Sequence, residues 1–247
     1  MRQVALLSMF ALQALCLFAE PPAGYQLKWS DEFEGSSLNL DRWNYRTDSK
    51  HWSTQLPANV TVEGGRLLLS LRKEKAGDKE YTGAGVISKQ AFRFGYYEAR
   101  FQIAAGKGWH SSFWMMGHDG SGGTGTTKTE LELDVIENDS IDLTSYGVNL
   151  HKWQGTHVSH GHKNVKTASL AEYHVFGCRY TPQTVQYFLD GQLVQTIDAA
   201  ALPHGDLHVW LTSIASFLGK TDAVDEARLP GRVAFDYVRY YTKMEEK

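Results

Sequence analysis

The sequence predicts an all-β fold, a sandwich of two antiparallel sheets. Short segments alternate apolar and polar side chains with a period of two, and turn residues separate them about every 8–12 residues, as is typical of such sandwiches. No helical period is sustained beyond residue 19. The chain of 247 residues is 42% hydrophobic and 12% aromatic, which is enough to bury one substantial core, so we expect a single folded domain.

The first 19 residues have the pattern of a secretory signal peptide. A positive residue, Arg2, precedes an apolar run over residues 4–18, and the small residue Ala19 follows. This run is shorter than the ~20 residues that a membrane-spanning helix needs. We expect cleavage after Ala19, so that residues 1–19 are removed and residues 20–247 form the mature domain, which would be secreted or periplasmic.

Charge and cysteine content exclude several classes of partner. The net charge of −3 provides no basic surface for nucleic acid or for an anionic membrane. Beyond the signal segment no apolar stretch approaches membrane length, so the mature protein should be soluble. Once the signal is removed, Cys178 is the only cysteine, and the fold must be held by its core without an intrachain disulfide. We expect a monomer.

The elements expected along the chain are strands separated by turn residues. Gly64-Gly65 separates the first two strands, which are rich in Val and Leu. Asp190-Gly191 joins two further alternating segments and is typical of a two-residue hairpin turn. In chain order the expected strands are residues 59–63, 66–72, 86–89, 94–103, 130–137, 146–153, 173–180, 184–189, 192–197, 207–214 and 233–241.

The acidic stretch from Glu130 to Glu137 carries the clearest functional signal. Glu130, Glu132 and Asp134 alternate with apolar residues, so an extended strand would project these three carboxyls from one face. Glu137 is out of phase with them. One inserted residue, a β-bulge near Val135-Ile136, would return Glu137 to the same face.

Two carboxylates on one surface are suited to glycoside hydrolysis. With the bulge, Glu132 and Glu137 would lie about four strand steps apart, or roughly 13 Å between Cα atoms. Their side chains can close this gap to the ~5–5.5 Å carboxyl separation of a retaining pair, while the wider gap of about 6.5–9.5 Å in an inverting pair is also compatible. A solvated acidic face and a calcium site are the non-catalytic interpretations.

The pattern Glu132-x-Asp134-x-x-Glu137 resembles the active-site motif of glycoside hydrolase family 16 in its bulged form. The opening segment 29–33, the segment 95–101 and the closing segment 235–241 also resemble that family. The resemblance implies a β-jelly roll with a concave substrate cleft, and a catalytic domain over residues 20–247. It also implies a secreted, endo-acting glycoside hydrolase that retains the anomeric configuration.

By motif position, the resemblance implies that Glu132 is the nucleophile, Glu137 the general acid/base and Asp134 the carboxyl between them. Asp134 should raise the pKa of one neighbour by like-charge repulsion or hydrogen bonding. Glu130 shares their face, but only Glu132 begins the motif. The substrate would be a polysaccharide, and no cofactor is required for this chemistry.

Five further residues are expected to bind substrate. The resemblance implies that Trp109 presents its ring to the sugar beside the scissile bond, although the aromatic run around Trp109 is by itself more typical of core. It also implies that His151, on the strand beside the acidic one, positions substrate or tunes Glu137. Many β-glucanases of the family have Pro after this Trp, whereas this chain has His110, which leaves the exact substrate open. The expected set is Trp109, His151, Trp153, Asn59 and Trp114.

One cation site is implied by the resemblance. Family members often bind a structural calcium ion on the convex side, and Asp236, Glu32 and Gly64 match those positions. The spacing of His157, His160 and His162 matches no two-His metalloprotease motif, so we expect no zinc there. The glycine-rich segment 118–127 lacks a Walker-type ending, so we expect a cleft rim and not a phosphate site.

Three hypotheses about function follow. The first is hydrolysis of β-1,3-glucan or mixed-linkage β-glucan, because the bulged motif and its flanking segments look most like those of laminarinases. The second is hydrolysis of a red-algal galactan by an agarase, porphyranase or carrageenase type of enzyme, since these also use the bulged form. The third is a non-catalytic carbohydrate-binding module, although such proteins usually lose one of the acids and this chain keeps all three.

Overall fold

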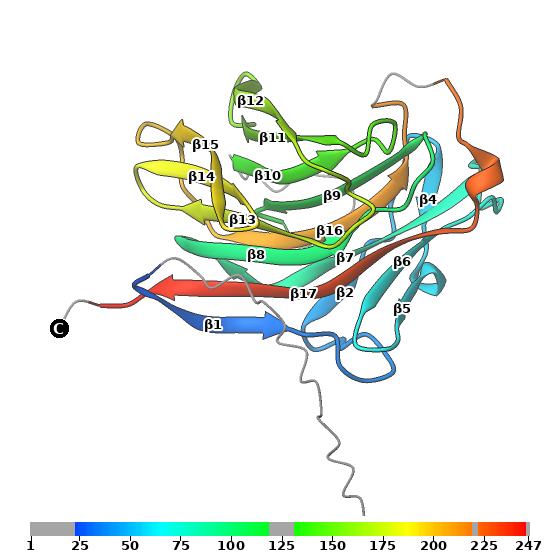
Figure 1. The fold of residues 1–247 in the computed structure, drawn as a ribbon, viewed down its shortest axis with the longest axis horizontal. Coiled ribbons are helices and arrows are strands. Elements are labelled where there is room, and N and C mark those ends of the chain that lie inside the picture. The colour runs from blue at the N-terminus through cyan, green and yellow to red at the C-terminus, as the bar shows by residue number, and fades with distance from the viewer. Residues whose placement is uncertain (1–22, 119–130, 219–221, 246–247) are drawn as a thin grey trace, which may run out of the picture.

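The structure, a computed structural model, describes residues 23–118, 131–218 and 222–245 (Figure 1). This part of the chain contains seventeen β-strands and two short 3-10 segments, η1 (Pro57–Asn59) and η2 (Glu226–Arg228). The expected signal peptide, Glu130 and most of the glycine-rich segment lie outside the described residues. None of the helices in the described ranges has the length and apolarity needed to cross a bilayer.

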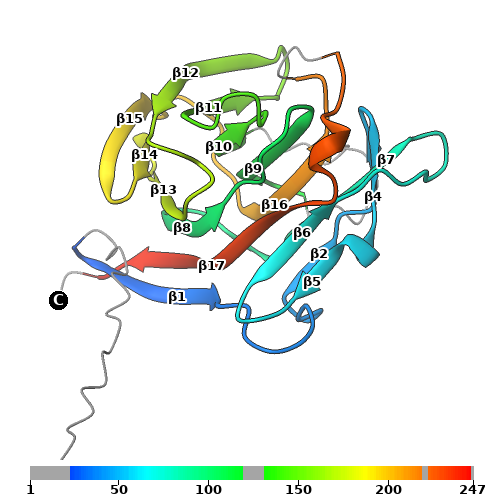
Figure 2. The same ribbon diagram turned by 45° about the vertical axis from the view of Figure 1, so that its right-hand side comes forward.

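One sheet has eight strands in the order β15-β14-β13-β8-β17-β6-β5, and β1 pairs with β17 beside this path. Figures 1 and 2 show β1 and β17 side by side. The strands of this sheet are β1 (Tyr25–Asp31), β5 (Val60–Val62), β6 (Leu67–Leu71), β8 (Gly95–Gln102), β13 (His174–Tyr180), β14 (Thr184–Leu189), β15 (Gln192–Asp198) and β17 (Gly231–Lys243).

The second sheet has nine strands in the order β12-β11-β10-β9-β16-β7-β4-β3, and β2 pairs with β7. Every strand pair in the two sheets is antiparallel except β4 with β7, which run parallel and so depart from the predicted pattern. The strands are β2 (Trp43–Tyr45), β3 (Ser49–Lys50), β4 (Ser53–Gln55), β7 (Tyr81–Phe92), β9 (Trp109–Met116), β10 (Leu131–Asn138), β11 (Ser145–Lys152), β12 (Val158–Lys166) and β16 (Leu207–Ala215).

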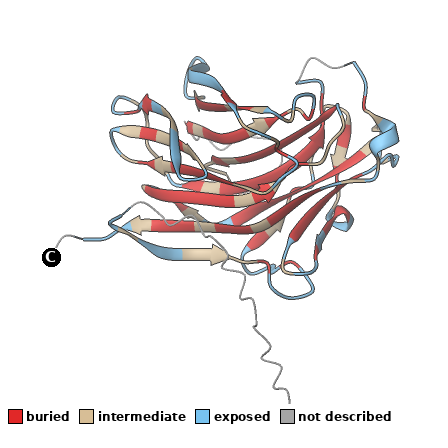
Figure 3. Ribbon diagram, in the orientation of Figure 1, coloured by how far each residue is buried: buried red, intermediate tan, exposed pale blue. Residues whose placement is uncertain are grey.

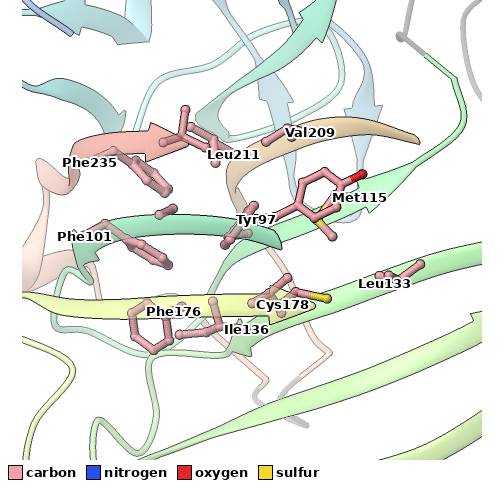
Figure 4. Packing of buried hydrophobic residues seen from close by; sticks show 14 of the residues in the cluster. Tyr97, Phe101, Met115, Leu133, Ile136, Phe176, Cys178, Val209, Leu211 and Phe235 are labelled. Atoms are coloured by element: carbon pink, nitrogen blue, oxygen red, sulfur yellow. The ribbon is translucent and has the colours of Figure 1, made fainter. Parts of the chain in front are cut away.

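The two sheets enclose the main apolar core, which Figure 3 shows as buried segments along the strands and Figure 4 shows at close range. The eight-stranded sheet contributes Tyr97, Phe101 and Phe235, and the nine-stranded sheet contributes Met115 and Leu133. Phe101 and Phe235 stack with their ring centroids 4.4 Å apart. Because this core removes apolar side chains from water, it fixes which face of each strand points inward.

Two turns connect strands as the sequence predicts. Asp190 and Gly191, between β14 and β15, both have positive φ, 48° and 78°, as a two-residue hairpin turn requires. Gly64-Gly65 joins β5 to β6 with φ values of 59° and 70°. Cys178 of β13 is buried in the core as a free thiol.

The nine-stranded sheet turns its other face away from the core, and we call it the outer face. Strands β11, β10, β9 and β16 are neighbours in that order, so the side chains that alternate outward from them share one surface. The predicted fold class, an all-β sandwich of two sheets, is confirmed. Strand β10, which carries the predicted catalytic carboxyls, contributes to this outer face.

Candidate active site

Strand β10 contains a β-bulge at the position that the sequence predicts. Its pairing with β11 shifts register between Asp134 and Glu137, and its pairing with β9 shifts between Asp134 and Ile136. Val135 and Ile136 both belong to the core cluster, and Figure 4 shows Ile136 among the core side chains. Two consecutive inward residues return Glu137 to the outer face, which it shares with Glu132 and Asp134.

Asp134, the middle carboxyl, is almost fully buried, with 2% of its surface exposed. His151 lies on the neighbouring strand β11, and its Nε2 is 3.2 Å from Asp134 Oδ2. The Nδ2 of Asn149 is 3.0 Å from the same imidazole nitrogen, and Ser159 Oγ donates to Asn149 Oδ1 at 2.9 Å. His151 therefore lies beside the acidic strand, where the resemblance places it.

Glu132 contacts Trp153, one of the residues expected to bind substrate. Trp153 Nε1 donates a hydrogen bond of 3.0 Å to Glu132 Oε2. Trp153 is 42% exposed and stacks on His157, with ring centroids 3.9 Å apart and 16° between the ring planes. His157 Nε2 in turn lies 2.9 Å from His151 Nδ1. An exposed, anchored indole beside a carboxylate is suited to contact the apolar face of a sugar ring.

Glu137 contacts a histidine of the other neighbouring strand. His110 lies on β9 and is 8% exposed. Its Nε2 is 3.1 Å from Glu137 Oε1, and its Nδ1 is 2.8 Å from Asp139 Oδ1. Both ring nitrogens therefore face carboxylate oxygens. The imidazole connects Glu137 to Asp139, a residue of the turn that follows β10.

Burial and mutual repulsion give the three carboxyls different proton affinities. Burial, followed by the charges of Glu137 and Glu132, raises the pKa of Asp134 well above its ordinary value. Burial also raises the pKa of Glu132, although the hydrogen bond from Trp153 opposes this rise. Burial alone would raise the pKa of Glu137, but the hydrogen bond and charge of His110 outweigh it, so this pKa lies below its ordinary value.

The prediction that Asp134 raises the pKa of one neighbour differs from the electrostatics of the site: the largest causes of the Glu132 and Glu137 shifts are other groups, and the strongest upward shift of the three carboxyls falls on Asp134 itself. Burial would lower the pKa of His110, but Asp139 and Glu137 raise it to about 9. His110 is therefore a cation at neutral pH. Its charge explains why the pKa of Glu137 is lowered while that of Glu132 is raised, although both glutamates share one strand face.

Trp114 also lies on the outer face, opposite Asp134 in the register of β9 with β10. Its ring packs on Trp210 of β16 with centroids 4.6 Å apart, and its Nε1 donates to Thr212 Oγ1 at 3.3 Å. The guanidinium of Arg46 lies 5.6 Å from the centroid of the Trp210 ring. This aromatic pair, half-buried at Trp114 and buried at Trp210, extends the site from β10 across β9 to β16, in a position compatible with the substrate-binding role expected of Trp114.

Trp109 does not reach the outer face, so the expectation that it contacts the sugar is wrong. Only 2% of its surface is exposed, and it packs in a small second apolar cluster with Leu71, Ala215 and Val224. The physical reason is strand phase. Trp109 is four residues before the inward-facing Phe113 on β9, so both side chains point to the same side of the sheet.

Asn59 is likewise unavailable to substrate, and its expected role is wrong. Its exposed fraction is 1%. The side-chain Nδ2 donates to Thr82 Oγ1 at 2.8 Å and to the backbone oxygen of Gly83 at 3.2 Å. Asn59 therefore ties η1 to β7, and the fold uses its amide as a structural hydrogen-bond donor.

The two carboxylates expected to bind calcium are both paired with arginine. The Glu32 carboxylate accepts two hydrogen bonds from Arg239, of 2.9 and 2.7 Å, and Asp236 Oδ2 pairs with Arg100 Nη1 at 2.6 Å. Gly64 lies in the exposed turn between β5 and β6. Because guanidinium groups already pair with both oxygens of Glu32 and with Oδ2 of Asp236, a calcium ion at these carboxylates would have to compete with arginine.

One set of side chains within the described ranges converges closely enough to hold a metal ion. Ligand atoms of Glu132, Asp134 and His151 all lie within 4.8 Å of one another. These residues belong to the acidic site itself, and hydrolysis by paired carboxylates needs no metal. The three histidines of the β11–β12 region that were considered for zinc form no such set in the part of the chain that the structure describes.

His110 is the site residue that sequence reasoning noted only as a departure from the family pattern. Strand alternation offered a signal for its orientation, because His110 and Ser112 are in phase with each other and opposite to the apolar residues Phe113 and Met115. Its partner Asp139 had no such signal. The contact joins residues 29 positions apart, which only the pairing of β9 with β10 brings together.

A β-sandwich that presents Glu132, Asp134 and Glu137 from a bulged strand has the features of an enzyme that cleaves glycosidic bonds with paired carboxylates. The family model described as "Beta-porphyranase A-D, GH16 domain" matches residues 25–208. The chain therefore belongs to glycoside hydrolase family 16 and is a glycoside hydrolase. Hydrolysis with retention of configuration is characteristic of this family.

Curated relatives carry several activities in their names. A beta-glucanase of Rhodothermus marinus is 25% identical over 90% of this chain and 86% of its own length. A glucan endo-1,3-beta-glucosidase of Cryptopygus antarcticus is 29% identical over 75% of this chain and 73% of its own. A keratan-sulfate endo-1,4-beta-galactosidase of Sphingobacterium multivorum is 26% identical over 88% of this chain, which spans 55% of that protein.

Solved structures support the fold. The laminarinase catalytic domain of Thermotoga maritima superimposes with a TM-score of 0.78, at 22% identity, over 90% of this chain and 99% of that domain. At this identity the likeness concerns the fold alone. It agrees with the jelly-roll architecture expected from the sequence.

Proposed function

We propose that this protein cleaves a β-linked polysaccharide within the chain, with Glu132 as nucleophile and Glu137 as general acid/base. The observation that carries this proposal is the bulge in β10, which presents both glutamates from the outer face with Asp134 between them in sequence. The exposed Trp153 and the Trp114–Trp210 pair lie on the two sides of β10. A polysaccharide crossing the strands would therefore meet aromatic rings on both sides of the acids.

In the first step Glu132 attacks the anomeric carbon while Glu137 gives its proton to the leaving oxygen, and the glycosidic bond breaks. In the second step Glu137 takes a proton from water, whose oxygen displaces Glu132 from the anomeric carbon. The Trp153 indole stabilises the ionised form of Glu132. Burial and the charges of Glu137 and Glu132 raise the pKa of Asp134 well above its ordinary value, which favours its neutral form beside the nucleophile.

For the substrate we propose β-1,3-glucan or mixed-linkage β-glucan. Two relatives support this choice, since one is named a beta-glucanase and the other a glucan endo-1,3-beta-glucosidase, and both align over three quarters of this chain or more. The flanking segments that resemble laminarinases in the sequence point the same way. The chain would release oligosaccharides from such a glucan and would itself need no cofactor.

A galactan is the second candidate, and the family model favours it. The description of the family model that matches residues 25–208 names β-porphyranases, and a third relative is named an endo-β-galactosidase. His110, which stands where many β-glucanases of the family have proline, is the residue of the site that departs from a β-glucanase pattern. A porphyran- or agar-type galactan would then occupy the same outer face.

Reducing-sugar release from laminarin, lichenan, agarose, porphyran and carrageenan, assayed side by side, separates these candidates. We expect the highest rate on laminarin or lichenan. A higher rate on porphyran or agarose would transfer the assignment to galactans. Binding to these polysaccharides without any release of reducing ends would contradict hydrolysis altogether.

Catalytic roles are tested by substitution on whichever polysaccharide is hydrolysed fastest. Glu132→Gln and Glu137→Gln should each lower kcat by roughly 10³-fold or more, because each removes a reacting group. Glu63→Gln, at an exposed glutamate paired with Arg232, is the matched control and should leave kcat unchanged. Undiminished hydrolysis by Glu132→Gln would rule out its role as nucleophile. Proton NMR of the first product should show the retained β-anomer.

Secretion is a separate proposal, supported by the apolar segment over residues 4–18 and the small residue that follows it. We expect the mature N-terminus to be residue 20. Expression of the full chain in a bacterium, followed by N-terminal sequencing of the extracellular and periplasmic fractions, tests this. Recovery of the intact chain only from the cytoplasm would contradict it.

A further inference from the structure

Glu137 is linked to two titratable side chains, His110 and Asp139, that the catalytic roles above do not use. Asp139 Oδ1 lies 2.8 Å from His110 Nδ1, and His110 Nε2 lies 3.1 Å from Glu137 Oε1. A protonated imidazole can donate to both carboxylates at these distances. This chain of contacts ends at Glu137 Oε1, so Oε2 is the oxygen of Glu137 that it does not use.

Asp139 is held in place by the turn that carries it. Asn138 Nδ2 donates to the backbone oxygens of Asp142 and Ser145 at 2.9 and 2.8 Å. The backbone nitrogen of Ser140 donates to Asn138 Oδ1 at 2.7 Å. Because these bonds close the turn on both sides of Asp139, its carboxylate approaches His110 from a fixed direction.

A histidine with a carboxylate partner is often only a structural element, and this chain contains such a pair elsewhere. His174 Nδ1 lies 2.7 Å from Asp190 Oδ2 in the eight-stranded sheet. His110 differs because its second nitrogen faces the carboxyl assigned as general acid/base, on the outer face of the other sheet. The His174–Asp190 pair therefore serves as a matched control.

We propose that His110 is the positioning residue of Glu137: oriented by Asp139, it donates from Nε2 to Glu137 Oε1 and so directs Oε2 to the scissile bond. The proposal rests on the acid/base role proposed for Glu137. His110 acts through Glu137 and does not contact the reacting sugar atoms. It also supplies a positive charge beside a group that changes its charge in each catalytic step.

The proton balance of both steps follows from this arrangement. In the enzyme–substrate complex Glu137 starts protonated on Oε2, with Oε1 accepting from His110. When Oε2 gives its proton to the leaving oxygen, the new Glu137 carboxylate is stabilised by the imidazolium, whose own charge Asp139 balances. In the second step water returns one proton to Oε2. His110 keeps both of its protons throughout.

Other charged groups also face this pair, and the pH dependence belongs to the whole set. The charges that lower the pKa of Glu137 come from histidines on β9, β11 and β12. The charge of His110 also lowers the pKa of His51 and of Asp134. The lowering of the Glu137 pKa by His110 nevertheless exceeds the contributions of the other histidines. The set comprises His110 on β9, Glu132 and Asp134 on β10, His151 on β11, His162 on β12, Asp139 in the turn after β10 and His51 before β4.

The pH profile of kcat distinguishes positioning from a structural role. The alkaline limb of this profile reports the ionisation of the general acid in the enzyme–substrate complex. His110→Gln keeps an N–H donor but removes the charge, so the pKa of Glu137 should rise and the alkaline limb should move up by about one pH unit or more. The loss of directed geometry should also lower kcat by about 10- to 100-fold, with KM little changed.

Two further variants complete the test. Asp139→Asn should move the alkaline limb in the same direction by a smaller amount, because the imidazole loses the carboxylate that keeps it charged. His174→Gln should lower thermal stability and leave the limb in place. An alkaline limb that stays in place or moves down in His110→Gln would overturn the proposal.

A substrate-free measurement separates failure of this inference from failure of the catalytic assignment. In a ¹⁵N-labelled sample the His110 imidazole should keep both nitrogens protonated to about pH 9. Glu137→Gln should lower that value, since Gln offers no charge to the cation. A His110 signal that titrates identically in both proteins would refute the contact. Full activity of Glu137→Gln would instead refute the acid/base role on which the inference depends.

Discussion

Replacing Glu98 by Gln should change how the stability of the protein depends on pH. Glu98 lies on β8 with 0% of its surface exposed. Its Oε1 accepts a hydrogen bond of 3.0 Å from Tyr241 and lies 3.8 Å from Arg239 Nη1, while Oε2 has no hydrogen-bond partner within the described ranges. Burial raises the pKa of Glu98 from 4.5 to about 7, although Tyr241 and Arg239 oppose the rise.

The magnitude follows from this shift. Because the folded pKa lies above the unfolded value, the folded state binds the proton more tightly. The stabilisation from Glu98 is therefore complete below about pH 4.5 and is lost as the pH rises through about 7. A difference of about 2.5 pKa units at ~1.36 kcal/mol per unit corresponds to about 3 kcal/mol between these limits. Gln cannot ionise, so the variant lacks this loss.

Urea denaturation of both proteins at pH 4.5 and pH 8 tests the reasoning. The free energy of unfolding of Glu98→Gln, relative to that of the original chain, should rise by about 3 kcal/mol from the lower to the higher pH. Taking the difference between proteins cancels the titration of the active-site carboxyls, which both share. Glu63→Gln, with an exposed carboxylate, should show almost no such change. An equal effect of Glu98→Gln at both pH values would refute the buried-carboxylate account.

The remaining predictions concern the site and its margins. Trp153→Phe should move the acidic limb of the kcat profile up by about one pH unit, because ionised Glu132 loses an N–H donor. Asp134→Asn should lower kcat by only about tenfold, far less than Glu132→Gln, because the raised pKa of Asp134 favours its neutral form. Trp114→Ala should raise KM by about tenfold through the loss of an aromatic contact to sugar. Trp109→Leu should destabilise the fold by about 2–4 kcal/mol in urea denaturation and leave kcat/KM within about twofold.

Each of these outcomes has a contrary result. An unchanged acidic limb in Trp153→Phe would mean that the indole does not stabilise the ionised nucleophile. A kcat of Asp134→Asn as low as that of Glu132→Gln would show that Asp134 acts as an anion. If Trp109→Leu lost substrate affinity without losing stability, that result would support a sugar contact by Trp109 and contradict its buried position.

Strand alternation predicted most of the fold because it is a local property. The hairpin at Asp190-Gly191 and the bulge at Val135-Ile136 both follow from short stretches of sequence, and the structure contains both. The orientation of Trp109 was also available from alternation, since it is in phase with Phe113. The family resemblance assigned it to the opposite face, and the strand phase of this chain decides against that assignment.

The pairs that alternation could not predict depend on contacts between distant segments. His110 meets Asp139 only because β9 and β10 are neighbours in register, and Glu32 meets Arg239 across 207 positions of sequence. A carboxylate in the sequence looks the same whether it is free or held by a guanidinium. The calcium expectation therefore depended on the partner of Glu32, which a single sequence does not reveal.

The bulge explains why two glutamates of one strand have opposite pKa shifts. It aligns Glu137 with Ser112 of β9 and Gly147 of β11, further along β10 than Glu132, which pairs with His151. Each glutamate therefore acquires different neighbours: Glu132 receives a neutral indole N–H, while Glu137 receives an imidazolium. In the free enzyme this favours a proton on Glu132 over one on Glu137. The reactive state needs the reverse, so substrate binding must change the balance by displacing water and placing an acceptor oxygen beside Glu137.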